Sequence, residues 1–169
     1  FLDKAIELWD YIYGLFWDDT YGGLCTRADT WDLGKDVYVQ GLFIYVCYVM
    51  YMHTGNTTYY NVITDLLEVL ENLWDNGFHS FYYPDFTIYN DVRCPYHLFW
   101  GLLGYYIGYT LTGNSLYLDR VSTLLSQEEA YFWDETYSGY YYSLWSDFSI
   151  CSDKKNAWRN AMALSTISI

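Results

Sequence analysis

A Trp-Asp pair occurs three times at nearly even spacing. Each copy ends an apolar helical pattern and begins a turn rich in Gly or aromatic residues. The pairs are Trp17-Asp18, Trp74-Asp75 and Trp133-Asp134, so the Trp residues are 57 and 59 residues apart (74 − 17 and 133 − 74). A period of this length is longer than one helix and shorter than a domain. Each copy is therefore expected to be one supersecondary unit that buries its apolar face against its neighbours, which predicts a repeat array.

A second mark has nearly the same period. Thr54-Gly55-Asn56 returns 58 residues later as Thr112-Gly113-Asn114 (112 − 54). We therefore expect one partial domain over 1–169, with repeats at about 1–56, 57–114 and 115–169. The first repeat begins at Phe1 without such a turn, and the last residues stop inside a helical pattern with no capping Gly or Pro. The sequence thus predicts part of a longer array.

Each repeat contains two helical patterns separated by a decorated loop. Residues 59–73 place apolar side chains at 3 to 4 residue spacing with acids on the other side, which predicts an amphipathic outer helix. Alternating aromatics follow, at 78–83 and 137–145, and predict small β-hairpins. A second helix, apolar nearly all round, is expected to be an inner one. The outer helices are expected at 2–16, 59–73 and 118–132, and the inner helices at 35–53, 93–111 and from 155 onward.

These patterns predict an all-α fold. Helical hairpins of this size stack into an open solenoid or into a closed α/α toroid whose inner helices surround a cleft. The predicted fold is a toroid fragment of about three helical hairpins. Its short β-hairpin loops should all lie at one end, because each connects an outer helix to an inner one.

Charge excludes one class of partner. The formal net charge is −13, with only 8 Lys and Arg residues and no basic cluster, which argues against nucleic acid. The longest apolar stretches are too short to span a bilayer, so no membrane partner is expected.

Four dispersed Cys residues lack a CxxC pair and are expected to be buried thiols in a reducing, cytoplasmic compartment, with a disulfide or metal site as the alternatives.

Aromatic content suggests a ligand. The chain has 22 Tyr and 8 Trp residues, and Tyr hydroxyls prefer a partner or water. So many amphipathic rings favour a wet, aromatic-lined cleft, and a small-molecule sugar is the ligand that suits it. Since half of a toroid would leave apolar inner helices open, self-association or pairing with a missing half of the same chain is also expected.

A cation begins each predicted inner helix. Lys35, Arg93 and Lys155 share one position in the repeat, and Gln40 and Asn160 lie five residues after two of them. One interpretation is that these groups face the cleft and donate hydrogen bonds to a ligand. The alternative is that each cation pairs with a neighbouring acid and orders the loop. The acids considered for that pairing are Asp32, Asp91 and Asp153.

The residues resemble a known family. The stretch 17–23, followed by Lys35 and then Tyr38-Val39-Gln40-Gly41, looks like the N-acylglucosamine 2-epimerase family. The segment 155–163 is similar both to a late inner helix of those epimerases and to the Lys-Asn-Ala segment of family 76 glycoside hydrolases. Both groups have six-hairpin α/α barrels, so the resemblance implies that this chain supplies about half of one.

His97 is the candidate for proton transfer. Cys94-Pro95-Tyr96-His97 resembles the segment in which the epimerases keep a catalytic His at the start of an inner helix. Imidazole suits the task because its ordinary pKa of about 6.5 lets it take and return a proton at neutral pH. A buried wall histidine is the alternative. His79 is a weaker candidate for contact with substrate, and the three His residues lack metal-ligand spacing.

The sequence therefore predicts a carbohydrate-active protein, most like a sugar epimerase or isomerase in which His97 transfers the proton. The alternatives are a glycoside hydrolase of the same fold and a non-catalytic sugar-binding or scaffold array. We expect neither a metal nor a cofactor. The candidate substrate-binding residues are Lys35, Gln40, Arg93, Tyr96, Lys155, Trp158, Asn160 and Trp31.

Overall fold

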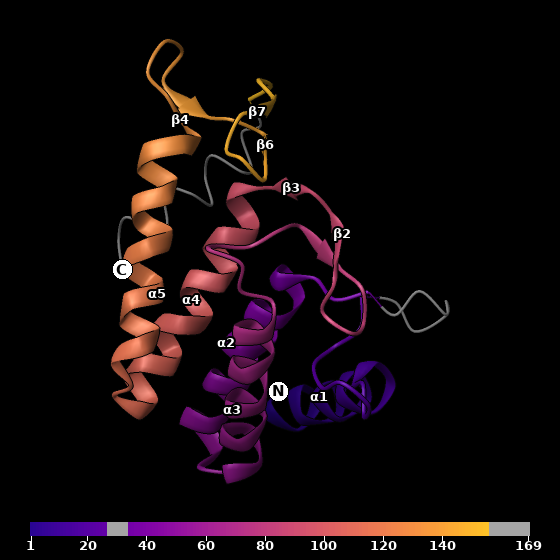
Figure 1. Ribbon diagram of the computed structural model, residues 1–169. Helices are drawn as coiled ribbons and strands as arrows, with labels where there is room; N and C mark the ends of the chain where they lie inside the picture. The colour runs from indigo at the N-terminus through magenta and orange to yellow at the C-terminus, as the bar shows by residue number, and fades with distance from the viewer. Residues whose placement is uncertain (27–33, 156–169) are drawn as a thin grey trace.

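The computed structural model describes residues 1–26 and 34–155. Within this part the chain alternates helices with short strands (Figure 1). The α-helices are α1 (Leu2–Phe16), α2 (Val37–Thr54), α3 (Thr57–Asn72), α4 (Pro95–Thr112) and α5 (Ser115–Gln127), and α5 continues into a π-helix, η1 (Glu128–Phe132). The outer helices α1, α3 and α5 alternate along the chain with the inner helices α2 and α4, as the pattern predicts.

The repeated Thr-Gly-Asn turn joins an inner helix to the next outer helix in the same way each time. Gly55 ends α2 with a φ of 67°, a left-handed conformation that Gly adopts without steric cost. Asn56 then caps α3, since its side-chain oxygen accepts a hydrogen bond from the Thr58 N–H. Gly113 and Asn114 repeat this geometry between α4 and α5. The same three residues therefore form the same connection between helices in both repeats.

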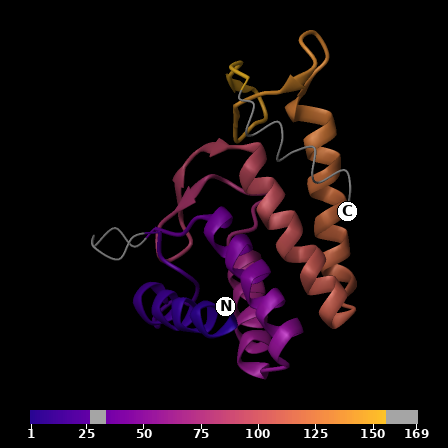
Figure 2. The same ribbon diagram turned by 180° about the vertical axis from the view of Figure 1, so that it is seen from behind.

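The inner helices form the centre of the packing. α2 packs against α4 and α3, and α4 packs against α5 (Figures 1 and 2). Close approach of α2 and α4 depends on Gly41, because a Cβ there would lie 2.2 Å from the backbone oxygen of Trp100. Ile44 and Leu98 are buried between these helices and their neighbours. Each outer helix after the first thus packs on the inner helix of the preceding hairpin.

Short antiparallel strands lie near the upper ends of the inner helices in Figure 1, and those of the third repeat lie at the top of the view. β1 pairs with β2, β4 with β5, and β6 with both β7 and β3. The β3–β6 pairing joins the second repeat to the third. The strands are β1 (Phe81–Tyr82), β2 (Ile88–Asn90), β3 (Val92–Arg93), β4 (Trp133–Asp134), β5 (Gly139–Tyr140), β6 (Ser143–Trp145) and β7 (Ile150–Ser152). The predicted all-α fold with small hairpins at one end is confirmed.

α1 differs from the other helices in its setting. It lies crosswise to them in both views (Figures 1 and 2), and Trp9 is its one buried residue. The Trp9 indole N–H donates to the Cys47 sulfur at 3.2 Å, and the ring stacks on Phe43 of α2. No helix in residues 1–26 and 34–155 is long and apolar enough to cross a membrane. The inner helix expected from Lys155 onward lies beyond the described residues.

Candidate functional site

The first predicted cation, Lys35, forms a buried ion pair with the Asp of the Trp-Asp motif. The Lys35 ammonium lies 2.8 Å from Oδ2 of Asp18, and neither side chain is appreciably exposed. The other carboxylate oxygen accepts hydrogen bonds from the N–H groups of Thr20 and Tyr21. Burial alone would raise the pKa of Asp18, but these hydrogen bonds and the charge of Lys35 lower it. The pair fixes the end of α1 to the residues just before α2.

The third repeat has the same arrangement. The Lys155 ammonium lies 2.7 Å from Oδ2 of Asp134, and Oδ1 of Asp134 accepts from the N–H groups of Thr136 and Tyr137. Lys155 also lies 3.9 Å from the centre of the Tyr141 ring, which adds a cation–π contact. The acid that binds each of these two lysines is therefore the Asp of the Trp-Asp motif. Asp153 is not that acid for Lys155, and Asp32 lies outside the described residues.

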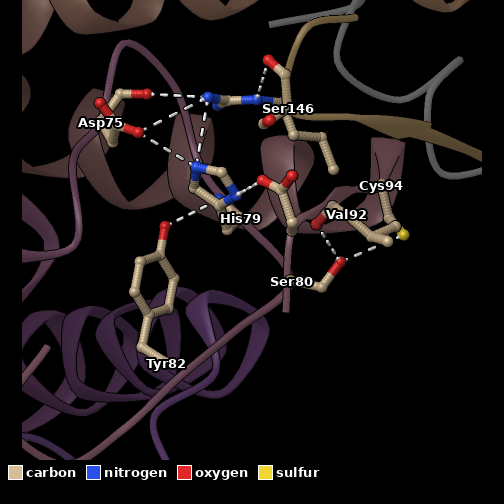
Figure 3. Close-up of polar contacts among 9 residues, drawn as sticks. Asp75, His79, Ser80, Tyr82, Val92, Cys94 and Ser146 are labelled. Atoms are coloured by element: carbon tan, nitrogen blue, oxygen red, sulfur yellow. Dashed lines mark hydrogen bonds and ion pairs between the residues drawn. The ribbon is translucent and has the colours of Figure 1, made fainter. Parts of the chain in front are cut away.

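The middle repeat inserts a histidine into this arrangement (Figure 3). Nε2 of His79 lies 3.1 Å from Oδ2 of Asp75 and 3.3 Å from Nη2 of Arg93. The Arg93 guanidinium donates to the backbone oxygens of Asp75 and Ser146 instead of forming a close ion pair. Its nearest approach to the Asp75 carboxylate is 3.9 Å, and Asp91 lies 3.7 Å from the other His79 nitrogen. Burial and the Arg93 charge lower the pKa of His79, so its neutral form is favoured.

The Gln40 side chain also forms hydrogen bonds to the protein itself. Its amide nitrogen donates to the Leu24 carbonyl at 2.7 Å, and its amide oxygen accepts from the Leu24 N–H at 2.8 Å. Gly23 lies against this amide, since a Cβ there would be 2.9 Å from the Gln40 oxygen. The side chain is fully buried and fixes the turn after Trp17 on α2.

His97 lies at the start of α4 and is fully buried. Nε2 is 3.0 Å from Oδ1 of Asp36, the residue that caps α2 by accepting from the Tyr38 N–H. Burial alone would lower the pKa of His97, but Asp36 and Cys94 outweigh burial and raise it. One carboxylate thus joins the first turns of both inner helices, and the protonated imidazole is favoured beside it.

Three aromatic side chains lie near this pair, and we call them the aromatic platform: Tyr38, Tyr96 and Trp100. The ring centres of Tyr38 and Tyr96 are 6.0 Å apart, and those of Tyr38 and Trp100 are 5.6 Å apart. All three are half-buried, and the Trp100 indole nitrogen has no hydrogen-bond partner among the described residues. Amphipathic rings of this kind suit a polyhydroxylated ligand.

Only Tyr96 of the platform is among the residues predicted from sequence, although a signal for Tyr38 exists. Tyr38, Tyr96 and Trp158 each stand three residues after the cation of their repeat. Aromatic residues at one position in three repeats indicate a shared role. Trp158, Trp31 and Asn160 lie outside the described residues.

The structure therefore brings His97 and Tyr96 together and uses Lys35 and Gln40 in internal contacts. Arg93 is almost fully buried, while Lys155 keeps 28% of its side chain exposed. The structure adds Asp36, Tyr38 and Trp100 to the candidate residues. Among residues 1–26 and 34–155, no group of three or more His, Cys, Asp or Glu side chains is placed to hold a metal ion.

No family model matches the sequence, and no curated protein matches it either. Solved structures do match. A cellobiose 2-epimerase from Spirochaeta thermophila superposes with a TM-score of 0.81 at 17% identity, over 99% of this chain and 48% of its own. A D-mannose isomerase gives a TM-score of 0.80 at 18% identity, over 99% and 46%. A family 76 α-mannanase from Bacteroides thetaiotaomicron gives 0.78 at 13%, over 97% and 47%. The chain thus spans about half the length of these proteins and shares their helical-hairpin fold.

Proposed function

We propose that the protein binds a sugar at the aromatic platform and transfers a proton on it, as an epimerase or isomerase does. The observation that carries this proposal is the His97–Asp36 pair, which lies at the first turns of α2 and α4 beside the platform. Two of the proteins that share the fold are named as a cellobiose 2-epimerase and a D-mannose isomerase, which supports a carbohydrate ligand.

The pair has the properties that proton transfer needs. The raised pKa of His97 favours the imidazolium, which is the form that can donate a proton. Neither ring nitrogen is exposed, whereas the Asp36 side chain keeps 9% of its surface exposed. We therefore assign the proton transfer to His97 and Asp36 as a unit, in which Asp36 is the group nearer to solvent. Burial of the unit excludes water from the transferred proton.

The platform would hold the sugar through its rings. Tyr96 and Tyr38 offer apolar faces and hydroxyl groups, and Trp100 offers the face of its indole ring. By sequence position, Trp158 would extend the platform, and Trp31, Asn160 and Lys155 would contribute further contacts. We assign Lys35, Gln40 and Arg93 to fixing the loops around the site, because their polar atoms bind protein groups.

A glycoside hydrolase is the second candidate, and the likeness to the α-mannanase favours it. Hydrolysis uses two carboxylates on either side of the glycosidic bond. The adjacent pair Asp18-Asp19 is poorly suited, because Asp18 is buried and bound by Lys35. Asp36 lies beside the platform, but it is paired with His97. A sugar-binding array without catalysis is the third candidate.

The test is solvent deuterium incorporation into D-mannose, D-glucose or cellobiose, measured by NMR on the recovered sugar. We expect deuterium at C2, and His97→Gln and Asp36→Asn should each lower its rate by roughly 10²-fold, the usual contribution of general acid-base catalysis. The exposed His53 provides the control, and His53→Gln should leave the rate unchanged. No deuterium in any sugar, or an undiminished rate in His97→Gln, would refute proton transfer. Release of mannose from mannan would instead support the hydrolase.

A further inference from the structure

The buried Arg93 side chain connects the second repeat to the third. Its guanidinium donates to the backbone oxygen of Asp75, in the turn after α3, and to the backbone oxygen of Ser146, in the turn between β6 and β7. It also lies 5.0 Å from the centre of the Phe148 ring in that second turn. Backbone pairing of β3 with β6 runs beside these contacts. A change in the position of the guanidinium would therefore act on residues 143–152, which we call the β6–β7 hairpin.

His79 lies against this guanidinium. Its backbone N–H donates to the Tyr82 hydroxyl at 2.7 Å, and its side chain is 1% exposed (Figure 3). The titratable and charged side chains that face the ring from the described residues are Asp75 after α3, Tyr82 on β1, Asp91 between β2 and β3, and Arg93 on β3. Asp75 and Asp91 are 63% and 65% exposed. The ring thus lies between one buried cation and two solvated carboxylates.

One ring nitrogen has two partners that require opposite proton states. Nε2 of His79 lies 3.1 Å from a carboxylate oxygen of Asp75, which only accepts hydrogen bonds, and 3.3 Å from Nη2 of Arg93, which only donates them. A protonated Nε2 donates to Asp75 and has no lone pair for Arg93. An unprotonated Nε2 accepts from Arg93 and has no proton for Asp75. The two hydrogen bonds are therefore alternatives, and the proton on Nε2 decides between them.

Protonation of the ring also places two like charges close together in a buried site. The side chains of His79 and Arg93 are 1% and 4% exposed, so water screens their repulsion only weakly. The imidazolium is held in place through its backbone by Tyr82. The turn after α3 leaves the guanidinium no space on its side, since a Cβ at Gly77 would lie 2.8 Å from Nη1. The repulsion therefore acts on the contacts of Arg93 with the β6–β7 hairpin.

We infer that His79 is a proton switch for the contact between the second and third repeats. Neutral His79 carries its proton on Nδ1 and accepts a hydrogen bond from Arg93 at Nε2. When His79 takes a second proton from solvent, Nε2 donates to Asp75 instead, and the guanidinium loosens its hold on the β6–β7 hairpin. The first and third repeats lack this switch, because the Asp of each Trp-Asp motif binds a Lys directly.

The direction of the change with pH follows from the surroundings of the ring. Burial and the Arg93 charge lower the pKa of His79, against the effect of Asp75 and Asp91. The neutral form therefore predominates at pH 6.5 and above, and the contact loosens as pH falls below the ordinary histidine pKa of about 6.5.

Hydrogen exchange of the 169-residue chain over a pH series from 7.5 to 5.0 tests the inference, with no sugar present, so the result is independent of the proposed activity. After correction for the intrinsic pH dependence of exchange, peptides from the β6–β7 hairpin should exchange roughly tenfold faster at pH 5.0, relative to peptides from the second half of α2. His79→Gln stays neutral and can accept from Arg93 through its amide oxygen, so it should remove this difference.

A second variant separates the switch from a general effect of charge. Asp75→Asn should move the transition to lower pH, because the imidazolium loses the carboxylate that accepts its proton. Asp65→Asn is the matched control, because it removes an exposed carboxylate from α3 that does not contact His79, and it should leave the transition in place. An Asp75→Asn transition that does not move, or one that moves equally in Asp65→Asn, would overturn the inference.

Nitrogen-15 NMR of the His79 ring in the parent chain checks the switch without any substitution. At pH 7.5 we expect the neutral tautomer with its proton on Nδ1. A proton on Nε2 at this pH would overturn the inference. So would protection of the β6–β7 hairpin that is independent of pH, or a pH dependence that His79→Gln retains.

Discussion

Two buried histidines have opposite proton preferences because their neighbours differ. Burial lowers the pKa of His79, and the adjacent Arg93 charge lowers it further, against the pull of Asp75 and Asp91. His97 is buried as well, yet Asp36 and Cys94 overcome burial and raise its pKa. The residue type was visible in the sequence, but its charge state depends on groups brought close by folding. Sequence reasoning could therefore select His97 and could not find Asp36.

This contrast predicts opposite pH dependences of stability. His97 with a raised pKa stabilises the fold fully below its unfolded pKa of about 6.5, and that contribution is lost as pH rises through its folded pKa. His79 with a lowered pKa contributes above about 6.5, and its contribution is lost as pH falls toward its folded pKa. The His79→Gln variant still has His97, so its free energy of unfolding should still fall as pH rises. The His97→Gln variant still has His79, so its free energy of unfolding should still fall as pH decreases.

Urea unfolding of both variants across pH 5 to 9 measures these slopes, with His53→Gln as the exposed control. Two variants with the same pH dependence as the parent chain would contradict the assigned proton preferences.

At the scale of elements, a buried Asp–Lys pair fastens the end of α1 to the residues just before α2, and a matching, partly exposed pair joins Asp134 to Lys155 in the third repeat. Asp18 and Asp134 each follow the Trp of their Trp-Asp motif. The sequence showed that both the acid and the cation repeat at the same period, which was the signal that they are partners. Proximity along the chain favours Asp32, Asp91 and Asp153 instead. Spacing within a repeat was the better guide.

Removing one member of such a pair should be strongly destabilising. Asp18→Asn leaves the Lys35 ammonium buried without a counter-charge, which costs about 3–5 kcal/mol in comparable buried pairs. Asp19→Asn is the control, because its side chain is exposed and no hydrogen bond of it is described, so a change below about 0.5 kcal/mol is expected. Urea unfolding measures both values, and equal effects of the two substitutions would show that the ion pair does not fasten the helices.

One of the two extra residues between the second and third Trp has a cause in one element. Asn114 and Trp133 are one residue farther apart than Asn56 and Trp74. The extra residue is accommodated by the π-helix η1, in which the helix widens locally and Phe132 stays buried. Periodicity predicted a helix over 118–132 and located its end correctly. It could not show the π-helix, because a single inserted residue leaves the apolar pattern on either side intact.

For the whole molecule, the repeat predicted the fold class, and the structure adds how unevenly the helices are buried. Stability in such arrays is distributed by nearest-neighbour contacts, so an element with one neighbouring hairpin is held less strongly than one with two. α1 buries only Trp9, whereas α4 buries residues along its whole length, from Pro95 to Gly108. The sequence could not show this difference, because 2–16 and 59–73 have equally clear helical patterns.

Hydrogen exchange should therefore be uneven across the array. Amides of α1 should exchange at least roughly tenfold faster than those of α4, because α1 opens locally at a lower free energy than the buried centre. Mass spectrometry of peptides from α1 and α4 measures the two exchange rates, and equal protection of the two helices would show that α1 is held as firmly as the inner helices.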